Sequence, residues 1–332
     1  MPAVSVVIPT WNGRALLAAC LAALAEQTER DFEVVVVDNG SADGTIAWLA
    51  QDHSHVRTIA NPTNLGFAAA VNQGIRHSQA PWVAVLNNDT EPEPQWLAAL
   101  LVAGNRGADV GMVSCTMLFA DRPSMINSTG ICVDHAGIAW DRDGGAADDP
   151  DDDEVVEIFG PCGGAALYRR TMLDQIGLFD EAFFAYLEDV DLAWRGRAAG
   201  WRCLYAPQAR VLHRHSATGI EGSPFKRYQL GRNKVRLLAK NYPFRQIWWG
   251  GAAVVLYDLA AVLYALAARR DVHALRGRLA GLRSIRSALR RRPSYAARGD
   301  LPFLSPLVAP WRVSQRYSHL EHHAHGDRVA SR

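Results

Sequence analysis

The sequence predicts an α/β protein built on a mostly parallel sheet with helices on both faces. Short apolar runs rich in β-branched residues, among them "VSVVIPT", "FEVVVVD" and "WVAVLNND", recur over the first 120 residues. Helical stretches such as "GRALLAACLAALAEQ" and "GFAAAVNQGIRHS" separate these runs from one another. Continuous apolar strands joined through helices are typical of a parallel sheet that is covered on both sides.

A chain of 332 residues has room for one large core and a smaller second region. We expect a folded domain over 1–230 and a basic helical C-terminal region over 231–332. Within the domain, strand and helix alternate over 1–120, an acidic loop rich in Gly and turn residues covers 141–157, and a second structured block covers 158–216.

The net charge of +1 hides a division between the two regions. Residues 231–332 contain 19 Lys and Arg against 5 Asp and Glu, whereas residues 1–230 contain 16 against 29. A basic tail on an acidic body predicts an anionic surface or a polyanion as partner of the tail. Nucleic acid is the poorer choice, because the body is acidic and no nucleic-acid fold signature is present.

The cysteines and the N-terminus predict a cytoplasmic protein. Five scattered cysteines without a CxxC pair fit reduced thiols and argue against a disulfide framework or a zinc site. The opening "MPAVSVVIPTWNG" enters a strand at once, without the basic and then long apolar segment of a secretory signal.

Polar side chains stand where the strand Trp82–Leu86 ends, at Asn87, Asn88 and Asp89. Ligands of open α/β sheets bind beyond the carboxyl ends of the strands. One carboxylate flanked by amides suits a hard divalent cation that bridges a diphosphate. The same residues are also compatible with an ordinary turn before the Pro-rich "TEPEP".

Two further strand ends carry candidate residues. Asp38 can hydrogen-bond a nucleotide base or ribose, or it can serve the turn "DNGS", after which Ser41 or Asp43 can cap a helix. Trp11 can stack on a base or pack beneath the following helix. The sequence has neither GxGxxG after the first strand nor GxxxxGK[ST], which removes the main support for Rossmann and P-loop sites.

The segment "YLEDVDLAWRGRAAGW" predicts a helix that begins near Glu188 and stops at Gly200. Its first acidic residues can serve the helix N-terminus, or one of them can act as a general base. His213 and His215 follow on one face of a strand, where an imidazole can complete a metal site or simply lie at the surface.

Taken together, the residues resemble the family 2 glycosyltransferases, inverting nucleotide-sugar enzymes with a GT-A fold. Within that family the chain is most similar to rhamnosyltransferase-like bacterial members that build cell-surface glycans. The similarity runs from about Val4 to Ser216 and continues weakly into "RNKVRLLAKNYP". Its specificity comes from the order of seven segments: "VSVVIPTWNG", "VVVVDNGSADGT", "NPTNLGFAAAVNQG", "VLNNDTEP", "GGAALYRR", "GLFDEAFFAYLEDVDLAWRGRAAGW" and "VLH".

The resemblance implies roles for individual residues. Asp189 matches the catalytic base, with Glu188 beside it, while Asp89 and His213 match ligands of a divalent metal, Mg²⁺ or Mn²⁺. Asn87 replaces the first aspartate of the family's DxD motif, so Asp89 would be the only carboxylate ligand from this motif. The residues that would bind the nucleotide sugar are Pro9, Thr10, Trp11, Asn12, Asp38, Ser41, Asn64, Gly66, Asn72, Asn87, Asn88, Gly163 and Gly164.

The resemblance also implies the reaction and its partners. The donor would be a nucleotide-diphosphate sugar such as dTDP-rhamnose or a UDP-sugar, and the acceptor a hydroxyl of a polyprenyl-linked or cell-surface glycan. Two alternatives stay open: a protein of this fold that binds a nucleotide sugar or glycan without turnover, and a nucleotidyltransferase. The usual Gly-rich N-terminal loop of the latter, with its basic residue, is missing.

The C-terminal region predicts a contact with an anionic membrane surface, at the inner face of the cell membrane. Residues 247–268 contain one charge, Asp258, and form either a bilayer span or a helix or hairpin that packs on the protein or lies at the interface. Arginines opposite an apolar stripe then predict an amphipathic helix on anionic lipid, or else a solvated basic face. The stripe consists of Leu275, Leu279, Leu282, Ile285 and Leu289.

Overall fold

The computed structural model describes residues 1–214, 223–293 and 304–308. The chain divides into two compact units. The first consists of Met1–Ile131 and Asp141–Thr218, and the second of Cys132–Trp140 and Gly219–Arg332.

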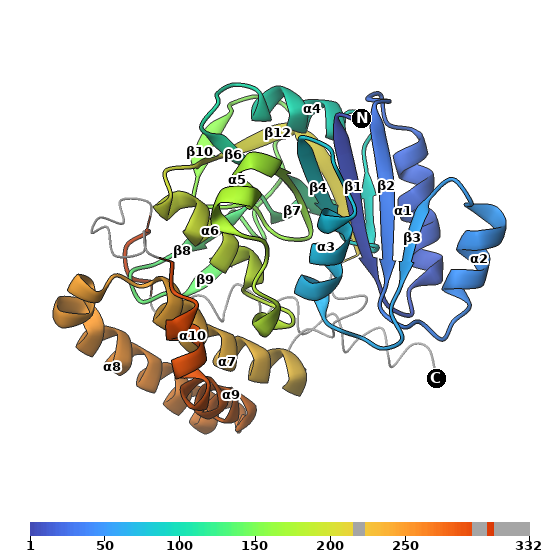
Figure 1. Cartoon of the computed structure of the whole chain (residues 1–332). Helices are drawn as coiled ribbons and strands as arrows, with labels where there is room; N and C mark the ends of the chain where they lie inside the picture. Colours follow the sequence, from blue (N-terminus) through green and yellow to red (C-terminus); the bar gives the residue numbers. More distant parts are fainter. Residues whose placement is uncertain (215–222, 294–303, 309–332) are drawn as a thin grey trace. The chain divides into compact units, whose positions relative to one another are not determined.

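A ten-stranded sheet forms the centre of the first unit (Figure 1). Its strands run in the order β10-β12-β6-β11-β4-β1-β2-β3, with β5 paired to β12 and β7 to β6. The parallel core that the sequence predicts is present in β4, β1, β2 and β3, while β11 runs antiparallel between β4 and β6. The strands are β1 Val4–Thr10, β2 Phe32–Asp38, β3 Arg57–Ala60, β4 Trp82–Leu86, β5 Thr90–Pro92, β6 Val110–Phe119, β7 Arg122–Ser128, β10 Val156–Ile158, β11 Ala165–Arg169 and β12 Arg202–His213.

Helices cover both faces of this sheet, which confirms the predicted α/β class. Residues of α1, α2 and α4 share a buried apolar cluster with Val4, Val6 and Ile8 of β1. The opposite face of β1 meets α3, where Gly74 lies against Val7. The helices of this unit are α1 Arg14–Ala25, α2 Thr45–Asp52, α3 Phe67–Arg76, α4 Trp96–Gly104, α5 Arg170–Ile176 and α6 Glu188–Ala198, with a short 3₁₀ helix at Glu181–Phe183.

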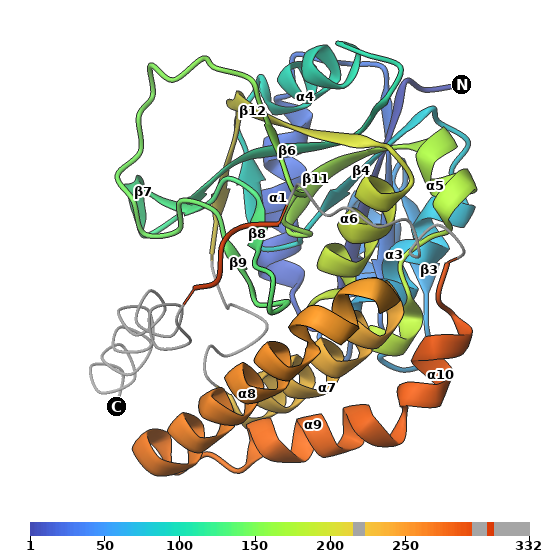
Figure 2. The ribbon, with the colours of Figure 1, turned by 90° about the vertical axis from the view of Figure 1, so that its left-hand side faces the viewer.

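The second unit consists mainly of helices (Figure 2). Three glycines let α7 and α9 touch through their backbones, since a Cβ on Gly277 would lie 2.1 Å from the carbonyl oxygen of Tyr228. A Cβ on Gly231 would lie 2.5 Å from the carbonyl oxygen of Ala274, and one on Gly281 would lie 2.7 Å from that of Arg232. The helices are α7 Pro224–Asn241, α8 Phe244–Arg269, α9 His273–Arg283 and α10 Ile285–Arg290. A small two-stranded sheet consists of β8 Ile131–Val133 and β9 Ala139–Asp141, where the sequence passes between the two units.

The structure tests two predictions about the C-terminal region. Among the described residues, no helix combines the length and the apolar character that a bilayer span needs. The prediction of one continuous amphipathic helix from Leu275 to Leu289 is wrong, because α9 ends at Arg283 and α10 starts at Ile285. Ser284 makes the break, with a backbone ψ of 3° that departs from the helix.

Candidate active site

The strand ends that carry the candidate residues lie at one edge of the sheet. Thr10 at the end of β1 pairs with Asp38 at the end of β2, and β4 runs parallel to β1 on its other side. β11 is antiparallel to β4, so its first residue, Ala165, lies beside Leu86 at this same edge. His213 at the end of β12 pairs with Thr90. Residues far apart in the sequence therefore meet beyond Leu86.

Hydrogen bonds connect the candidate residues along this edge. The amide nitrogen of the Asn88 side chain donates to Thr10 Oγ1 at 2.8 Å. The backbone N–H of Asn87 donates to the carbonyl oxygen of Gly164 at 2.8 Å. The adjacent N–H of Gly163 donates to Asp189 Oδ2 at 2.9 Å. These bonds place the nucleotide-binding candidates of β1 and the carboxylate of α6 in one continuous site.

Asp38 takes the turn role with one carboxylate oxygen and leaves the other oxygen unpartnered. Its Oδ2 accepts hydrogen bonds from the backbone N–H groups of Gly40 and Ser41, at 3.1 and 2.9 Å, which fixes the turn. Its Oδ1 is buried and has no hydrogen-bond partner among the residues the structure describes. A buried carboxylate oxygen without a donor is costly, so a donor on a ligand is the natural partner for it.

Side chains around the end of β1 fasten its loop to the loop after β2. Ser41 Oγ accepts from the backbone N–H of Asn12, and Asn12 Oδ1 accepts from that of Ala42, both at 2.8 Å. Pro9 is buried within β1. Trp11 is 41% exposed, so it is not buried beneath the following helix.

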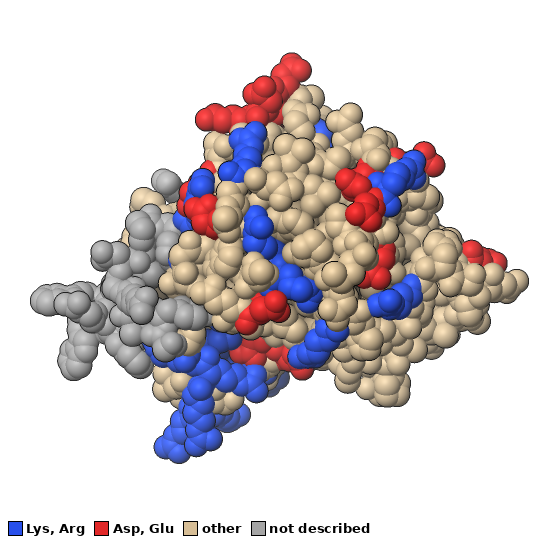
Figure 3. Space-filling view, turned by 45° about the horizontal axis from the view of Figure 1, so that its top comes forward, with Lys and Arg blue, Asp and Glu red and all other residues tan. Residues whose placement is uncertain are grey.

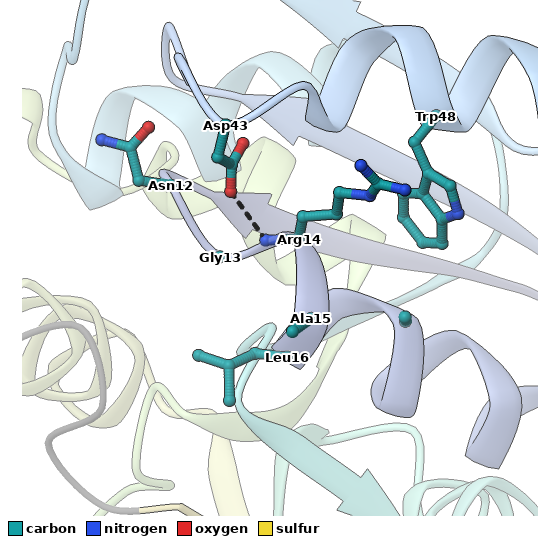
Figure 4. Close-up of a pocket in the computed structure, with 8 residues that line it drawn as sticks. Asn12, Gly13, Arg14, Ala15, Leu16, Asp43 and Trp48 are labelled. Atoms are coloured by element: carbon teal, nitrogen blue, oxygen red, sulfur yellow. Dashed lines mark hydrogen bonds between the residues drawn. The ribbon is translucent and has the colours of Figure 1, made fainter.

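A shallow hollow of about 480 Å³ is lined by residues of this loop, of α1 and of the start of α2 with the loop before it (Figure 4). Asp43 accepts a hydrogen bond from the backbone N–H of Arg14 at 2.9 Å, and the Arg14 guanidinium lies 5.8 Å from the centre of the Trp48 ring. Asp43 also accepts from the N–H and hydroxyl of Thr45 at the start of α2, but the N-cap residue of this helix is Gly44, not Asp43 or Ser41. Neither Asp89 nor Asp189 lines the hollow. We therefore place the chemistry at the strand edge.

Asp89 and His213 form the candidate metal pair. Their side chains approach to 3.4 Å between Asp89 Oδ1 and His213 Nε2, and both are almost completely buried. His213 Nδ1 lies 2.7 Å from Asn127 Oδ1, an oxygen that can only accept, so Nδ1 carries a proton. In the neutral ring the Nε2 lone pair then points toward a carboxylate oxygen, an arrangement that a cation between them would stabilise.

The donor set fits Mg²⁺ or Mn²⁺, although it is small. Carboxylate and amide oxygens with one imidazole are ligands that these hard ions accept. Over the described parts of the chain, no group of three or more His, Cys, Asp and Glu side chains is arranged to hold a metal. Asp89 and His213 would therefore need oxygens of a bound diphosphate or water to complete the coordination. His215 lies outside the described residues.

Asn64 and Asn72 organise the protein itself. Asn64 Oδ1 accepts from the backbone N–H of Gly66 at 2.9 Å. The buried Asn72 amide donates to the Phe179 carbonyl oxygen and to Glu181, and it accepts from the N–H of Phe179. Asn72 thus ties α3 to the segment that leads into Glu188 and Asp189. In this structure it acts as a positioning residue.

A strained turn precedes the two carboxylates, and nothing in the sequence predicts it. Phe184 has φ 66° and ψ −64°, and the N–H of Ala185 donates to the carbonyl oxygen of Phe183 at 2.8 Å. These values define a γ-turn of the rare positive-φ type. Tyr186 and Leu187 also have positive φ angles. Such strain persists only where the surroundings hold it, and it concentrates at functional sites.

Gly66 is what permits this turn to pack against α3. A Cβ at Gly66 would lie 2.6 Å from the Phe184 ring and 2.7 Å from the Phe184 carbonyl oxygen. The same oxygen accepts from the N–H of Ala68 at 3.3 Å. The glycine that the sequence assigns to the donor site therefore also supports the loop that carries the carboxylates.

Glu188 and Asp189 are neighbours with different environments. Burial, together with the charge of Asp189, raises the pKa of Glu188 well above its usual value, and its Oε2 has no hydrogen-bond partner among the described residues. Burial also raises the pKa of Asp189, but N–H donors from Gly163 and Val190 oppose the shift. Hydrogen bonds to the charged form favour ionisation. We infer that Glu188 holds the proton while Asp189 is the more readily ionised carboxyl of the two.

A neutral Glu188 makes stability depend on pH. A carboxyl whose pKa is higher in the folded than in the unfolded state adds to the free energy of unfolding at low pH. This contribution is lost as the pH rises from the pKa of the unfolded state, near 4.5, through the pKa of the folded state. We expect Glu188→Gln to gain stability over the wild type as the pH rises across this window. Urea unfolding at a series of pH values measures the difference. Identical pH slopes in the two proteins would contradict a protonated Glu188; Asp174→Asn, at an exposed position, is the control.

Comparison with known proteins gives the family. The model of "Glycosyl transferase family 2" matches residues 5–177. The N-acetylglucosaminyl-diphospho-decaprenol L-rhamnosyltransferase of Mycobacterium tuberculosis is 33% identical over 245 residues, which cover 66% of this chain and 78% of that protein. The O-antigen biosynthesis protein RfbC of Myxococcus xanthus is 30% identical over 229 residues, which cover 65% of this chain and 18% of that protein.

Solved structures support the same fold. A mannosyltransferase from Pyrobaculum calidifontis, in complex with GDP-Man and Mn²⁺, matches with a TM-score of 0.51 at 22% identity, over 96% of this chain and 80% of that one. The sheet order, the helices on both faces and this likeness identify the GT-A architecture. Together with the family match over more than half of the sequence, they show that the chain is a glycosyltransferase and belongs to glycosyltransferase family 2.

Proposed function

We propose that the protein transfers a sugar, with inversion, from a nucleoside-diphosphate donor to a hydroxyl of a lipid-linked or cell-surface glycan. The observation that most supports this proposal is the hydrogen bond from the Gly163 N–H to Asp189, which holds a carboxylate beside Asn87–Asp89 at the end of β4. The rhamnosyltransferase relative, whose name includes a diphospho-decaprenol, supports a polyprenyl-linked acceptor and a donor such as dTDP-rhamnose. A UDP-sugar is the other donor to be tested.

The reaction is a single displacement. Asp189 accepts the proton of the acceptor hydroxyl while the oxygen of that hydroxyl forms a bond to the anomeric carbon. The bond from this carbon to the nucleoside diphosphate breaks on the opposite face, and its electrons leave with the diphosphate. Because attack and departure occur on opposite faces, the configuration inverts.

The donor site supplies position and charge. Asp38, through its unpartnered Oδ1, would accept from the nucleotide base, and the exposed Trp11 would stack on it. Asp89 and His213 would hold Mg²⁺ or Mn²⁺, which when bound neutralises charge on the leaving diphosphate. The Asn88 side chain donates a hydrogen bond to Thr10 and so holds the ends of β1 and β4 together.

A donor panel tests the function directly. The purified protein is incubated with dTDP-rhamnose, UDP-sugars and GDP-sugars, Mn²⁺ and a polyprenyl-diphosphate-linked acceptor, and nucleoside diphosphate release is measured. Release that requires the acceptor supports the proposal. Pyrophosphate release would instead indicate a nucleotidyltransferase, while binding without release would indicate a protein that only holds the nucleotide sugar.

Asp89→Asn tests the metal assignment separately from turnover. We expect the variant to lose at least roughly tenfold in apparent Mn²⁺ affinity, because an amide lacks the charge that a hard cation prefers. Thermal shift with nucleoside diphosphate, with and without Mn²⁺, measures this loss. An unchanged metal-dependent shift in the variant would remove Asp89 from the site. Asp174→Asn serves as the control for the loss of a carboxylate elsewhere.

A further inference from the structure

One face of α8 is exposed and entirely apolar. Its exposed large side chains are Val255 at 58%, Leu256 at 67%, Leu259 at 53%, Leu263 at 64% and Tyr264 at 40%. Ala252, Ala260 and Ala267 are exposed on the same side. From residue 252 to 267 the face is about 24 Å long at the helical rise of about 1.5 Å per residue. A contiguous apolar surface of this kind marks an interaction site.

Asp258 determines which side of α8 faces outward. Its Oδ1 lies 2.8 Å from Lys234 Nζ on α7, and its Oδ2 lies 2.7 Å from Arg278 Nε on α9. The single charge in the middle of the helix is therefore satisfied within the second unit. These ion pairs turn α8 so that the opposite side, which carries no charged residue between 252 and 267, points to solvent.

Exposed arginines are present on the helices that follow α8. α9 contacts α8 and carries exposed Arg276 and Arg283, and α10 adds exposed Arg286 and Arg290. Leu279 and Leu282 of α9 are themselves 46% and 53% exposed. Figure 3 shows a group of Lys and Arg side chains at the lower margin of the view, with others scattered over the rest of this face. Apolar side chains beside arginines match the acyl boundary and the phosphates of an anionic bilayer.

We propose that the exposed face of α8, comprising Val255, Leu256, Leu259, Leu263 and Tyr264, lies in the interface of an anionic phospholipid bilayer. The exposed arginines of α9 and α10 then contact lipid phosphates. A second copy of the chain fits less well, because a self-paired face would bring arginines of like charge together. The proposal rests on the proposed function in one respect, since a polyprenyl-linked acceptor is held in such a bilayer.

Vesicle binding tests the proposal. The full chain is sedimented with vesicles of phosphatidylglycerol and phosphatidylcholine, and with vesicles of phosphatidylcholine alone. We expect binding to the anionic vesicles that weakens with salt, and a loss of roughly tenfold or more in Leu256→Gln/Leu263→Gln. Val102→Gln, at a 66% exposed position on α4, is the matched control and should bind as the wild type does.

A second variant keeps the test independent of the apolar substitutions. Arg286→Gln/Arg290→Gln should lose affinity for anionic vesicles and keep the weak binding to neutral ones. Unchanged binding in both double variants, or a dimer that dissociates in Leu256→Gln/Leu263→Gln while vesicle binding persists, would overturn the proposal. The vesicles contain neither donor nor acceptor, so this result is separate from that of the transfer assay.

Discussion

Asp189→Asn is expected to lower kcat by roughly 10² to 10⁴-fold, the usual contribution of a general base. The amide cannot accept the acceptor proton, but it can keep the oxygen that receives the Gly163 N–H at 2.9 Å. Donor affinity should therefore stay within a few-fold of the wild type. Single-turnover transfer and isothermal titration with the nucleoside diphosphate measure the two quantities.

Glu188→Gln is the matched comparison. Because Glu188 holds its proton, the amide is a close substitute, and transfer should be largely retained. Full activity of Asp189→Asn, or equal losses in both variants, would remove Asp189 from the role of base. Equal loss of donor binding and of transfer would instead indicate that Asp189 supports the donor site.

Gly66→Ala is expected to destabilise the protein by about 2–5 kcal/mol, the sum of backbone strain and overpacking. With φ 90° and ψ 166°, Gly66 occupies a region that side chains avoid, and the new methyl group would lie 2.7 Å from the backbone oxygen of Phe184. The γ-turn would have to move, and Asp189 with it. We expect a lower denaturation midpoint together with a loss of kcat.

Gly200→Ala separates the effect of backbone strain from the effect of the contact with Phe184. Gly200 has a similar φ of 94°, but a Cβ there would meet nothing within 4 Å. This variant should show only the backbone contribution, about 1 kcal/mol, with unchanged kcat. If Gly66→Ala matched it in both stability and activity, the contact with Phe184 would have no functional importance.

Much of the first unit follows from the sequence because its signals are local. Runs of β-branched residues and helical stretches predict β1, β2 and β4 and the helices between them, and polar residues after apolar strands predict the edge of the sheet at which the candidate residues meet. The exposed Trp11 and the close approach of Asp89 and His213 depend on packing. The sequence could offer only alternatives for them.

The features that the sequence did not predict depend on long-range contacts. Asn127 meets His213 across 86 residues, and no motif marks that asparagine. The γ-turn at Phe184 exists because Gly66, more than a hundred residues earlier, leaves space for it. The break at Ser284 is a further case, since the leucine spacing continues through it without change.

The bond from the Gly163 main chain to Asp189 has a consequence for redesign. The proposed base takes its orientation from a peptide group, which no substitution of a neighbouring side chain removes. Side chains around Asp189 can therefore be exchanged in a library while the carboxylate oxygen that accepts this bond keeps its position. Specificity for a new alcohol is in this sense uncoupled from the chemical step, which makes the scaffold a starting point for glycan synthesis.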